Sequence, residues 1–192
     1  MQERMSVETA QQSPRIAPAE PPYSEAVAAA LARVMPAGVA PLALFRALAV
    51  NERVFLRVMA GGLLDRGSLT LRERELVIDR TCFRCRSEYE FGVHVAFFGP
   101  RVKLTEQETR GLVTDDPAAT VFTPREQLLL RLCDELHASA TIGDLLWAAL
   151  AAEWSSEQLV ELVILAGYYH AIAFATNALR VPLEPFAARF PM

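Results

Sequence analysis

The chain has 192 residues, of which 52% are hydrophobic, and its formal net charge is −4 at pH 7. This length suits one domain with a full core, and the apolar fraction with little glycine favours a helical globule over a β-sandwich or barrel. Acids and bases are interspersed, which argues against nucleic acid or an anionic membrane as a partner. Three cysteines, an odd number, argue against a secreted disulfide scaffold, so a reducing, cytoplasmic location is expected.

The N-terminal 22 residues are rich in Gln, Ser, Pro and Glu, a composition that buries too little apolar surface to order itself. We expect residues 1–22 to form a flexible tail or, alternatively, an extended arm packed on its own or a neighbouring subunit. Residues 23–192 are expected to form a single helical domain. The start of the chain lacks the apolar region of a signal peptide, and no uninterrupted apolar segment of membrane-spanning length is expected.

Capping residues and helix breakers divide the rest of the chain into predicted helices. Ser24 caps the first helix, Pro41 stands at the first position of the second, and Asn51 caps the third. The third helix is expected to continue through a kink at Gly61 and Gly62. Further helices begin at four hydroxyl residues, Thr105, Thr123, Thr141 and Ser156, and no strand-like alternation appears, so the sequence predicts an all-α protein.

Residues 70–99 are predicted to form one continuous helix, from a Thr-x-x-Glu capping box at Thr70 to the helix stop at Gly99. The start of this helix resembles residues 156–164, because both contain Glu-Leu-Val-Ile at the same distance from a capping residue. A duplicated helical unit would explain this likeness. Chance would explain it equally well, since capped amphipathic helices look alike.

Most of the reactive side chains lie in this predicted helix. Ser87, Glu90 and His94 would share one stripe, and Glu90 is one turn from His94, close enough to orient its imidazole. Arg80 would project near His94, and Glu75 would lie on a neighbouring stripe. A charged pair among apolar residues is unfavourable unless it is satisfied or used, so a functional pocket at His94 is predicted. The alternative is a structural salt bridge.

Cys82 and Cys85 form a Cys-x-x-Cys pair in the interior of the predicted helix. Such a pair has a lowered thiolate pKa at a helix N-terminus, but this one lies about three turns beyond the cap. Structural thiols are the favoured interpretation, and a redox pair is the alternative. No metal site is expected, because zinc requires three or four protein ligands and no second ligand pair occurs at metal spacing.

The run Glu75-Leu-Val-Ile, followed by Cys82 and by residues 87–94, resembles the signature of the carboxymuconolactone decarboxylase family. This family includes the alkylhydroperoxidase-D-like proteins. Its decarboxylase-like members carry Tyr-Glu-Trp-x-x-His, and the present chain reads Tyr-Glu-Phe-Gly-Val-His from Tyr89 to His94. The resemblance extends from about residue 42 to the C-terminus.

The peroxidase members carry Cys-x-x-Cys-x-x-x-His with an upstream Glu. Aligned on His94, that motif places its two cysteines at Ser87 and Glu90 and its glutamate at Glu75. Both redox positions are therefore occupied by other residues, and the Cys-x-x-Cys pair of this chain begins five residues earlier. The departure argues against hydroperoxidase activity.

The resemblance implies an alkylhydroperoxidase-D-like helical bundle that is commonly a homo-oligomer and acts on a small molecule without a cofactor. The implied reaction is decarboxylation of a carboxylated lactone, or a related acid–base step. His94 would carry the proton, Glu90 would orient it and Glu75 would support it, while Arg80 and Ser87 would bind the substrate. Two alternatives stay open, namely a thiol peroxidase that uses Cys82 and Cys85 and an oligomeric relative without catalytic activity.

Overall fold

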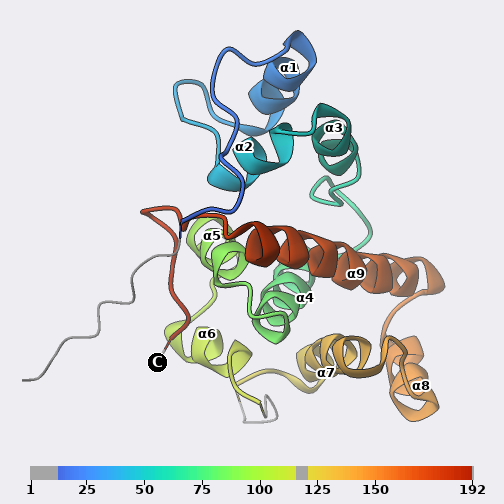
Figure 1. The fold of residues 1–192 in the computed structure, drawn as a ribbon. Helices are drawn as coiled ribbons and strands as arrows, with labels where there is room; N and C mark the ends of the chain where they lie inside the picture. The colour runs from blue at the N-terminus through green and yellow to red at the C-terminus, as the bar shows by residue number, and fades with distance from the viewer. Residues whose placement is uncertain (1–12, 116–120, 192) are drawn as a thin grey trace, which may run out of the picture.

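The computed structural model describes residues 13–115 and 121–191, and these residues form helices and loops without any strand (Figure 1). The predicted all-α class is confirmed. The helices are α1 Glu25–Val34, α2 Ala43–Ala49, α3 Glu52–Ala60, α4 Leu71–Arg84, α5 Glu88–Phe98, α6 Glu106–Leu112, α7 Pro124–Ser139, α8 Asp144–Glu153 and α9 Ser156–Leu179.

Most helix starts follow the capping chemistry of the sequence. Complete capping boxes begin at three of the predicted residues, Thr70, Thr105 and Thr123. The box of α9 begins at Ser155 with Gln158, one residue before the predicted cap, so the register of the proposed internal likeness differs between α4 and α9. The α3 helix ends at Ala60 instead of continuing through the predicted kink, with Gly61 as its C-cap.

The main correction concerns residues 70–99, which form two helices and not one. The α4 helix ends at Arg84, and Arg86 adopts a left-handed backbone conformation with φ of 56°. The amide of Ser87 then donates to the carbonyl of Cys82 at 2.8 Å. The side-chain amide of Asn177 on α9 donates to the backbone carbonyl of Cys85 at 2.8 Å. This turn folds α5 back against α4 and decides which reactive side chains meet.

The described helices surround two apolar clusters, and α9 contributes residues to both. In Figure 1, α9 runs between the group α1–α3 on one side and α7 and α8 on the other. The larger cluster lies between α4, α7, α8 and α9 and includes Leu76, Leu129, Leu150 and Leu162. The smaller cluster packs α1, α2 and α3 against α5 and α9 and includes Val27, Leu44, Phe55, Tyr89 and Ile172. The reactive segment α4–α5 therefore lies in the middle of the molecule, where burial and dry surroundings strengthen electrostatic interactions.

Segments near both termini pack along this body. Within residues 13–22, the amide of Arg15 donates to the carbonyl of Leu179, and the amide of Ala19 donates to the carbonyl of Arg46. Residues 1–12 of the predicted tail lie outside the described residues. Near the other end, the amide of Ala188 donates to the carbonyl of Gly92 at 3.1 Å, so the C-terminal segment covers one face of α5.

The α9 helix is long and apolar enough to cross a membrane, with 24 residues and a mean hydropathy of 1.6 in its most apolar window. This corrects the expectation that no segment reaches that length. Length and composition do not separate a membrane span from the core helix of a globular protein. Here α9 packs on α4, α5 and α8, and its other face exposes Val160, Ile164 and Phe174.

Candidate active site

His94 on α5 and Glu75 on α4 form the centre of a buried polar cluster. The ring Nδ1 of His94 lies 2.7 Å from Oε2 of Glu75 and donates its proton to that carboxylate. The second oxygen of the carboxylate, Oε1, accepts a bond from the guanidinium of Arg74 at 3.0 Å. Glu75 is therefore held between a cation and an imidazole, and it fixes the orientation of the ring.

The other ring nitrogen of His94 faces a tyrosine from α9. Nε2 lies 3.0 Å from the hydroxyl of Tyr169 and 3.6 Å from Oε2 of Glu90, which is one turn earlier on α5. His94 is 4% exposed and Glu90 is 5% exposed, so bulk water contributes little to these contacts. The structure thus brings together the three predicted catalytic residues and adds Tyr169.

The surrounding charges favour a protonated His94. Burial alone would lower its pKa, but the hydrogen bond that the ring donates to Glu75 and the negative charges of Glu75, Glu90 and Asp79 outweigh it, and the pKa is raised from 6.5. Burial also raises the pKa of Glu90, although the positive charge of His94 opposes the rise. An imidazolium beside several carboxyl groups can hold a transferable proton.

Sequence reasoning missed Asp79, which lies four residues after Glu75 on the same face of α4. Its side chain is fully enclosed, and burial raises its pKa well above 3.8, while the positive charge of His94 opposes that rise. Its Oδ1 has no hydrogen-bond partner among the described residues. The i, i+4 spacing from Glu75 was the available signal, but it became meaningful only once His94 was known to face α4.

Tyr169 was also not assigned to the site from the sequence. Burial and the nearby charge of Glu90 raise the pKa of its phenol well above 10, so the hydroxyl keeps its proton. It can donate to a neutral His94 or accept from the imidazolium. The signal was a polar-tipped ring inside the apolar α9, where a buried hydroxyl usually requires a partner.

The prediction that Arg80 projects towards His94 and binds substrate is wrong. Arg80 is fully buried, and its guanidinium makes a bidentate ion pair with Asp134 at 2.7 Å on both sides. Its remaining bonds go to the carbonyls of Leu112 and Thr114. These contacts leave no free edge for a substrate carboxylate, and they tie α4 to α7 and to the end of α6.

Ser87, the second predicted substrate-binding residue, is also engaged within the protein. It is fully buried at the start of α5, and its hydroxyl lies 2.9 Å from the hydroxyl of Thr176 on α9. Its side chain makes no capping bond to α5. The position that the peroxidase motif gives to a cysteine therefore holds a hydroxyl pair that joins two helices.

The two vicinal cysteines face different surroundings, and both are free thiols. Cys82 is fully buried, and burial together with the charges of Glu90 and Asp79 raises its pKa well above 9. Cys85 is half-buried at the end of α4, where burial raises its pKa to about 11. Its Sγ lies 3.8 Å from Nδ1 of His137, on the far side of the turn from His94. Neither thiol has the lowered pKa of a reactive cysteine.

A hollow of about 350 Å³ opens close to the buried cluster. Its lining is basic in part, with Arg66, Arg74 and Arg101, and it also includes Asp65, Glu161 and Phe98. The ring of Phe98 stacks on His94 at a centroid distance of 5.2 Å, so it forms the wall between the hollow and the imidazole.

The predicted pocket directly at the Glu90–His94 pair is corrected by this arrangement. Neither of the two hollows described for this structure is lined by Glu90 or His94. Their side chains pack in the interior against Tyr169 and Glu75, and Phe98, which lines the smaller hollow, stacks on His94.

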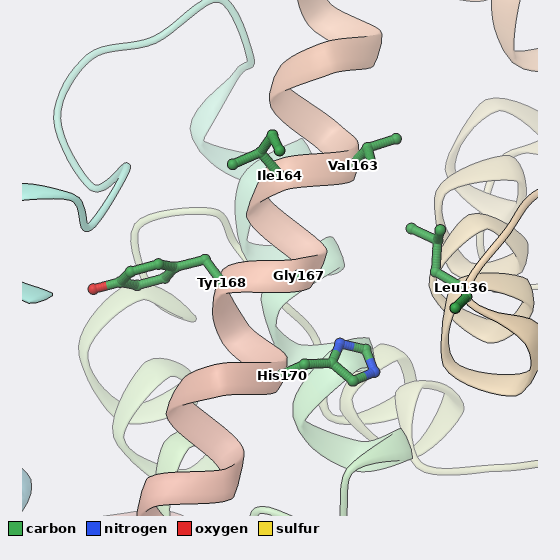
Figure 2. Close-up of a pocket in the computed structure, with 7 residues that line it drawn as sticks. Leu136, Val163, Ile164, Gly167, Tyr168 and His170 are labelled. Atoms are coloured by element: carbon green, nitrogen blue, oxygen red, sulfur yellow. The ribbon is translucent and has the colours of Figure 1, made fainter.

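A second hollow, of about 540 Å³, lies between α7 and α9 and has a mainly apolar lining (Figure 2). Figure 2 shows His170 projecting from α9 towards the helix that carries Leu136. The Nε2 of His170 lies 3.1 Å from Nδ1 of His137 at the end of α7. This edge of the hollow therefore collects two imidazoles beside the thiol of Cys85.

No protein-family model matches the sequence, and no curated protein matches it. Solved structures do resemble it. An uncharacterized peroxidase-related protein from Ralstonia eutropha JMP134, described as an alkylhydroperoxidase AhpD core, matches with a TM-score of 0.73 and 17% identity over 90% of this chain and 93% of its own. An uncharacterized peroxidase-related protein from Silicibacter sp. TM1040 matches with a TM-score of 0.66 and 16% identity over 77% and 80% of the two chains. The chain therefore has the alkylhydroperoxidase-D-like helical fold that its sequence predicts.

Proposed function

We propose that this protein is a cofactor-free acid–base enzyme that acts on a small carboxylated substrate, with His94 as the proton carrier. The observation that carries the proposal is the buried chain from Glu75 through His94 to Tyr169, with contacts of 2.7 and 3.0 Å. A hydrogen-bonded carboxylate stabilises the imidazolium and fixes the ring, while the second nitrogen is left to exchange a proton. Glu90 and Asp79 tune the pKa of the same ring.

The reaction class that fits is decarboxylation of an unsaturated lactone acid, or a related proton transfer. The bond between carbon and the carboxylate breaks, carbon dioxide leaves, and the electron pair delocalises into the lactone carbonyl as an enolate. The imidazolium of His94 then protonates the carbon and recovers its proton from water. Buried donors around the enolate would lower the barrier, because they act in surroundings of low polarity.

The basic hollow supports a negatively charged substrate. Its volume of about 350 Å³ suits a small molecule, and Arg74 and Arg101 both lie over the Phe98 ring, at 5.3 and 5.4 Å. A carboxylate held by Arg101 would lie in the hollow that Phe98 lines, while His94 packs against the same ring. Movement of the Phe98 ring would then bring substrate and imidazole together. Arg101 replaces Arg80 as the proposed anion-binding residue, because the guanidinium of Arg74 already bonds Glu75 and the carbonyl of Leu64.

The test is release of carbon dioxide from carboxymuconolactone by the whole chain. His94→Gln should lower the rate by about 100- to 10,000-fold, the usual contribution of a positioned acid or base. Arg101→Gln should raise KM with a smaller effect on kcat. The matched control is Arg110→Gln, which removes only an exposed ion pair to Glu106 on α6. Equal rates for the wild type and His94→Gln, or no release from the wild type, would overturn the proposal.

The competing function is peroxide reduction, because the two structural neighbours are peroxidase-related proteins. It would require both thiols of Cys82 and Cys85 to be oxidised to a disulfide as one peroxide is reduced. Their raised pKa values oppose this, because the thiolate is the attacking species. We expect treatment with cumene hydroperoxide to leave both thiols titratable, with Cys82→Ser as the comparison. Loss of two thiols in the wild type alone would favour the peroxidase.

A further inference from the structure

We propose that Cys85, His137 and His170 form a binding site for a divalent metal ion of the zinc type. The three residues come from three different helices, since Cys85 caps the end of α4, His137 lies in the last turn of α7 and His170 lies in α9. One ligand atom from each lies within 4.8 Å of the others. A thiolate with two imidazoles is a donor set that suits zinc and leaves a fourth position open for water or another ligand.

The distances between the donor atoms agree with tetrahedral zinc. Bond lengths of about 2.05 Å to nitrogen and about 2.3 Å to sulfur imply separations of about 3.3 Å between two nitrogens and about 3.6 Å between nitrogen and sulfur. The observed separation of Nδ1 of His137 from Nε2 of His170 is 3.1 Å. The Sγ of Cys85 lies 3.8 Å from the same Nδ1. Small side-chain rotations would therefore bring both pairs to bonding geometry.

Hydrogen bonds with α9 residues already orient two of the three ligands. Nδ1 of His170 lies 2.8 Å from the carbonyl of Ala166, which can only accept, so this nitrogen carries the proton. The Nε2 of the neutral ring then presents its lone pair towards His137, the arrangement that metal-binding histidines use. The side-chain amide of Asn177 donates to the backbone carbonyl of Cys85 at 2.8 Å and fixes the backbone that carries the thiol. Both supports come from α9 and are independent of any ion.

The electrostatic surroundings suit a cation. The site lies at the C-terminal ends of α4 and α7, where the partial negative charge of each helix dipole favours a positive charge. Among the charged side chains that act on His137, Asp134 favours a cation and Arg84, 3.5 Å from Asp134, opposes one. A thiolate from Cys85 would supply the remaining negative charge.

Of the three ligands, His170 also lines the apolar hollow between α7 and α9, so the site lies at the edge of that hollow (Figure 2). Metal bound there would join the C-terminal ends of α4 and α7 to the middle of α9 through side chains. Its open position would face a hollow of about 540 Å³ lined by Leu136, Val163 and Ile164. An apolar ligand with one metal-binding group is the class of molecule that this hollow would accept, independently of the proposed acid–base function.

The experiment uses the whole, tag-free chain with zinc or cobalt as the only probe. After saturation with zinc and removal of free ion, we expect about one zinc per chain, the stoichiometry of one three-ligand site. With cobalt, we expect a thiolate-to-metal charge-transfer absorption band. Cys85→Ser should abolish that band, and His137→Ala should weaken affinity by more than about 100-fold, since even outer-shell changes weaken metal sites about 10- to 100-fold.

Cys133→Ser is the matched control, because that thiol is buried in the larger core cluster and bonds the carbonyl of Val77. It should retain the metal and the band. Circular dichroism of each variant reports folding, and His137→Ala changes an exposed side chain, so loss of metal in a folded protein can be measured. The proposal is overturned if the wild type retains no zinc, or if Cys85→Ser and His137→Ala retain as much as the wild type.

Discussion

Glu75 and His94 lie 19 positions apart on two different helices, yet Oε2 of one and Nδ1 of the other are 2.7 Å apart. This contact exists because the chain reverses between α4 and α5 at Arg86. It makes the carboxylate of Glu75, and not that of Glu90, the direct hydrogen-bond partner of the ring. The chemistry proposed for the protein depends on this pair.

Glu75→Gln should lower the pKa of His94. The substitution removes the hydrogen bond and the negative charge that raise that pKa, while the burial that lowers it remains. Nuclear magnetic resonance of the three imidazoles across the pH range would measure the change, with His94→Gln identifying the signal. An unchanged pKa would show that the other carboxyl groups, Glu90 and Asp79, hold the proton on the ring.

The same pair predicts how stability depends on pH. Because the folded pKa of His94 is raised, its contribution is fully present below the unfolded pKa near 6.5 and is lost as pH rises through the folded pKa. The wild type should therefore lose free energy of unfolding over that range, and Glu75→Gln should lose less. Urea unfolding at several pH values between 6 and 9 measures both slopes, and parallel slopes would contradict the assignment.

Asp79→Asn should stabilise the protein increasingly as pH rises. The folded pKa of Asp79 is raised well above 3.8 by burial, so ionisation at higher pH favours the unfolded chain. The amide of Asn has nearly the same shape and does not titrate, so the variant does not lose stability from this ionisation. The measurement is the difference in free energy of unfolding between variant and wild type at pH 5 and pH 8, which should grow with pH. A constant difference would mean that Asp79 is ionised throughout.

Tyr169→Phe tests the second partner of His94, and the adjacent tyrosine provides a control. Tyr168 directs its hydroxyl to the carbonyl of Val58 at 2.9 Å, away from the imidazole. Tyr169→Phe should change the pH profile of catalysis and of the His94 resonance, because it removes the group 3.0 Å from Nε2. Tyr168→Phe should leave both profiles as in the wild type. A shared effect of the two variants would indicate a loss of packing instead.

Local chemistry made the helix starts predictable. Thr70, Thr105 and Thr123 each precede a glutamate by three residues, and the reciprocal bonds form as that spacing requires. Such bonds involve neighbours in sequence, so no knowledge of the fold is needed. The alkylhydroperoxidase-D-like fold was likewise predicted from the run between Glu75 and His94.

The break between α4 and α5 was not predictable, because no glycine or proline marks it. Arg86 takes the left-handed conformation, and the turn is stabilised by a bond from Asn177, 92 positions away from Cys85. The predicted direction of Arg80 was wrong for the same reason, because it assumed one continuous helix over residues 70–99. The convergence of Cys85 with two histidines from α7 and α9 depends on the same turn.

Arg80→Gln should destabilise the fold by about 3 kcal/mol, because it leaves a partly buried carboxylate of Asp134 without its partner. Chemical denaturation measures the loss. Arg110→Gln breaks an exposed ion pair with Glu106 on α6 and should change stability by less than about 0.5 kcal/mol. The folded fraction of Arg80→Gln should bind substrate with the wild-type KM. A raised KM at unchanged stability would restore the original assignment.

Gly92→Ala should loosen the C-terminal segment from α5. A methyl group at this position would clash with the carbonyl oxygen of Ala188, and backbone cannot yield as a side-chain tip can. We expect a loss of about 1–3 kcal/mol, the usual effect of overpacking, and faster proteolysis of the segment after residue 182. Gly167→Ala on α9 is the matched control, since no atom lies within 4 Å of the added methyl. It should stabilise the helix by about 0.5–1 kcal/mol. If both variants were stabilised, the contact between Gly92 and Ala188 would not exist in solution.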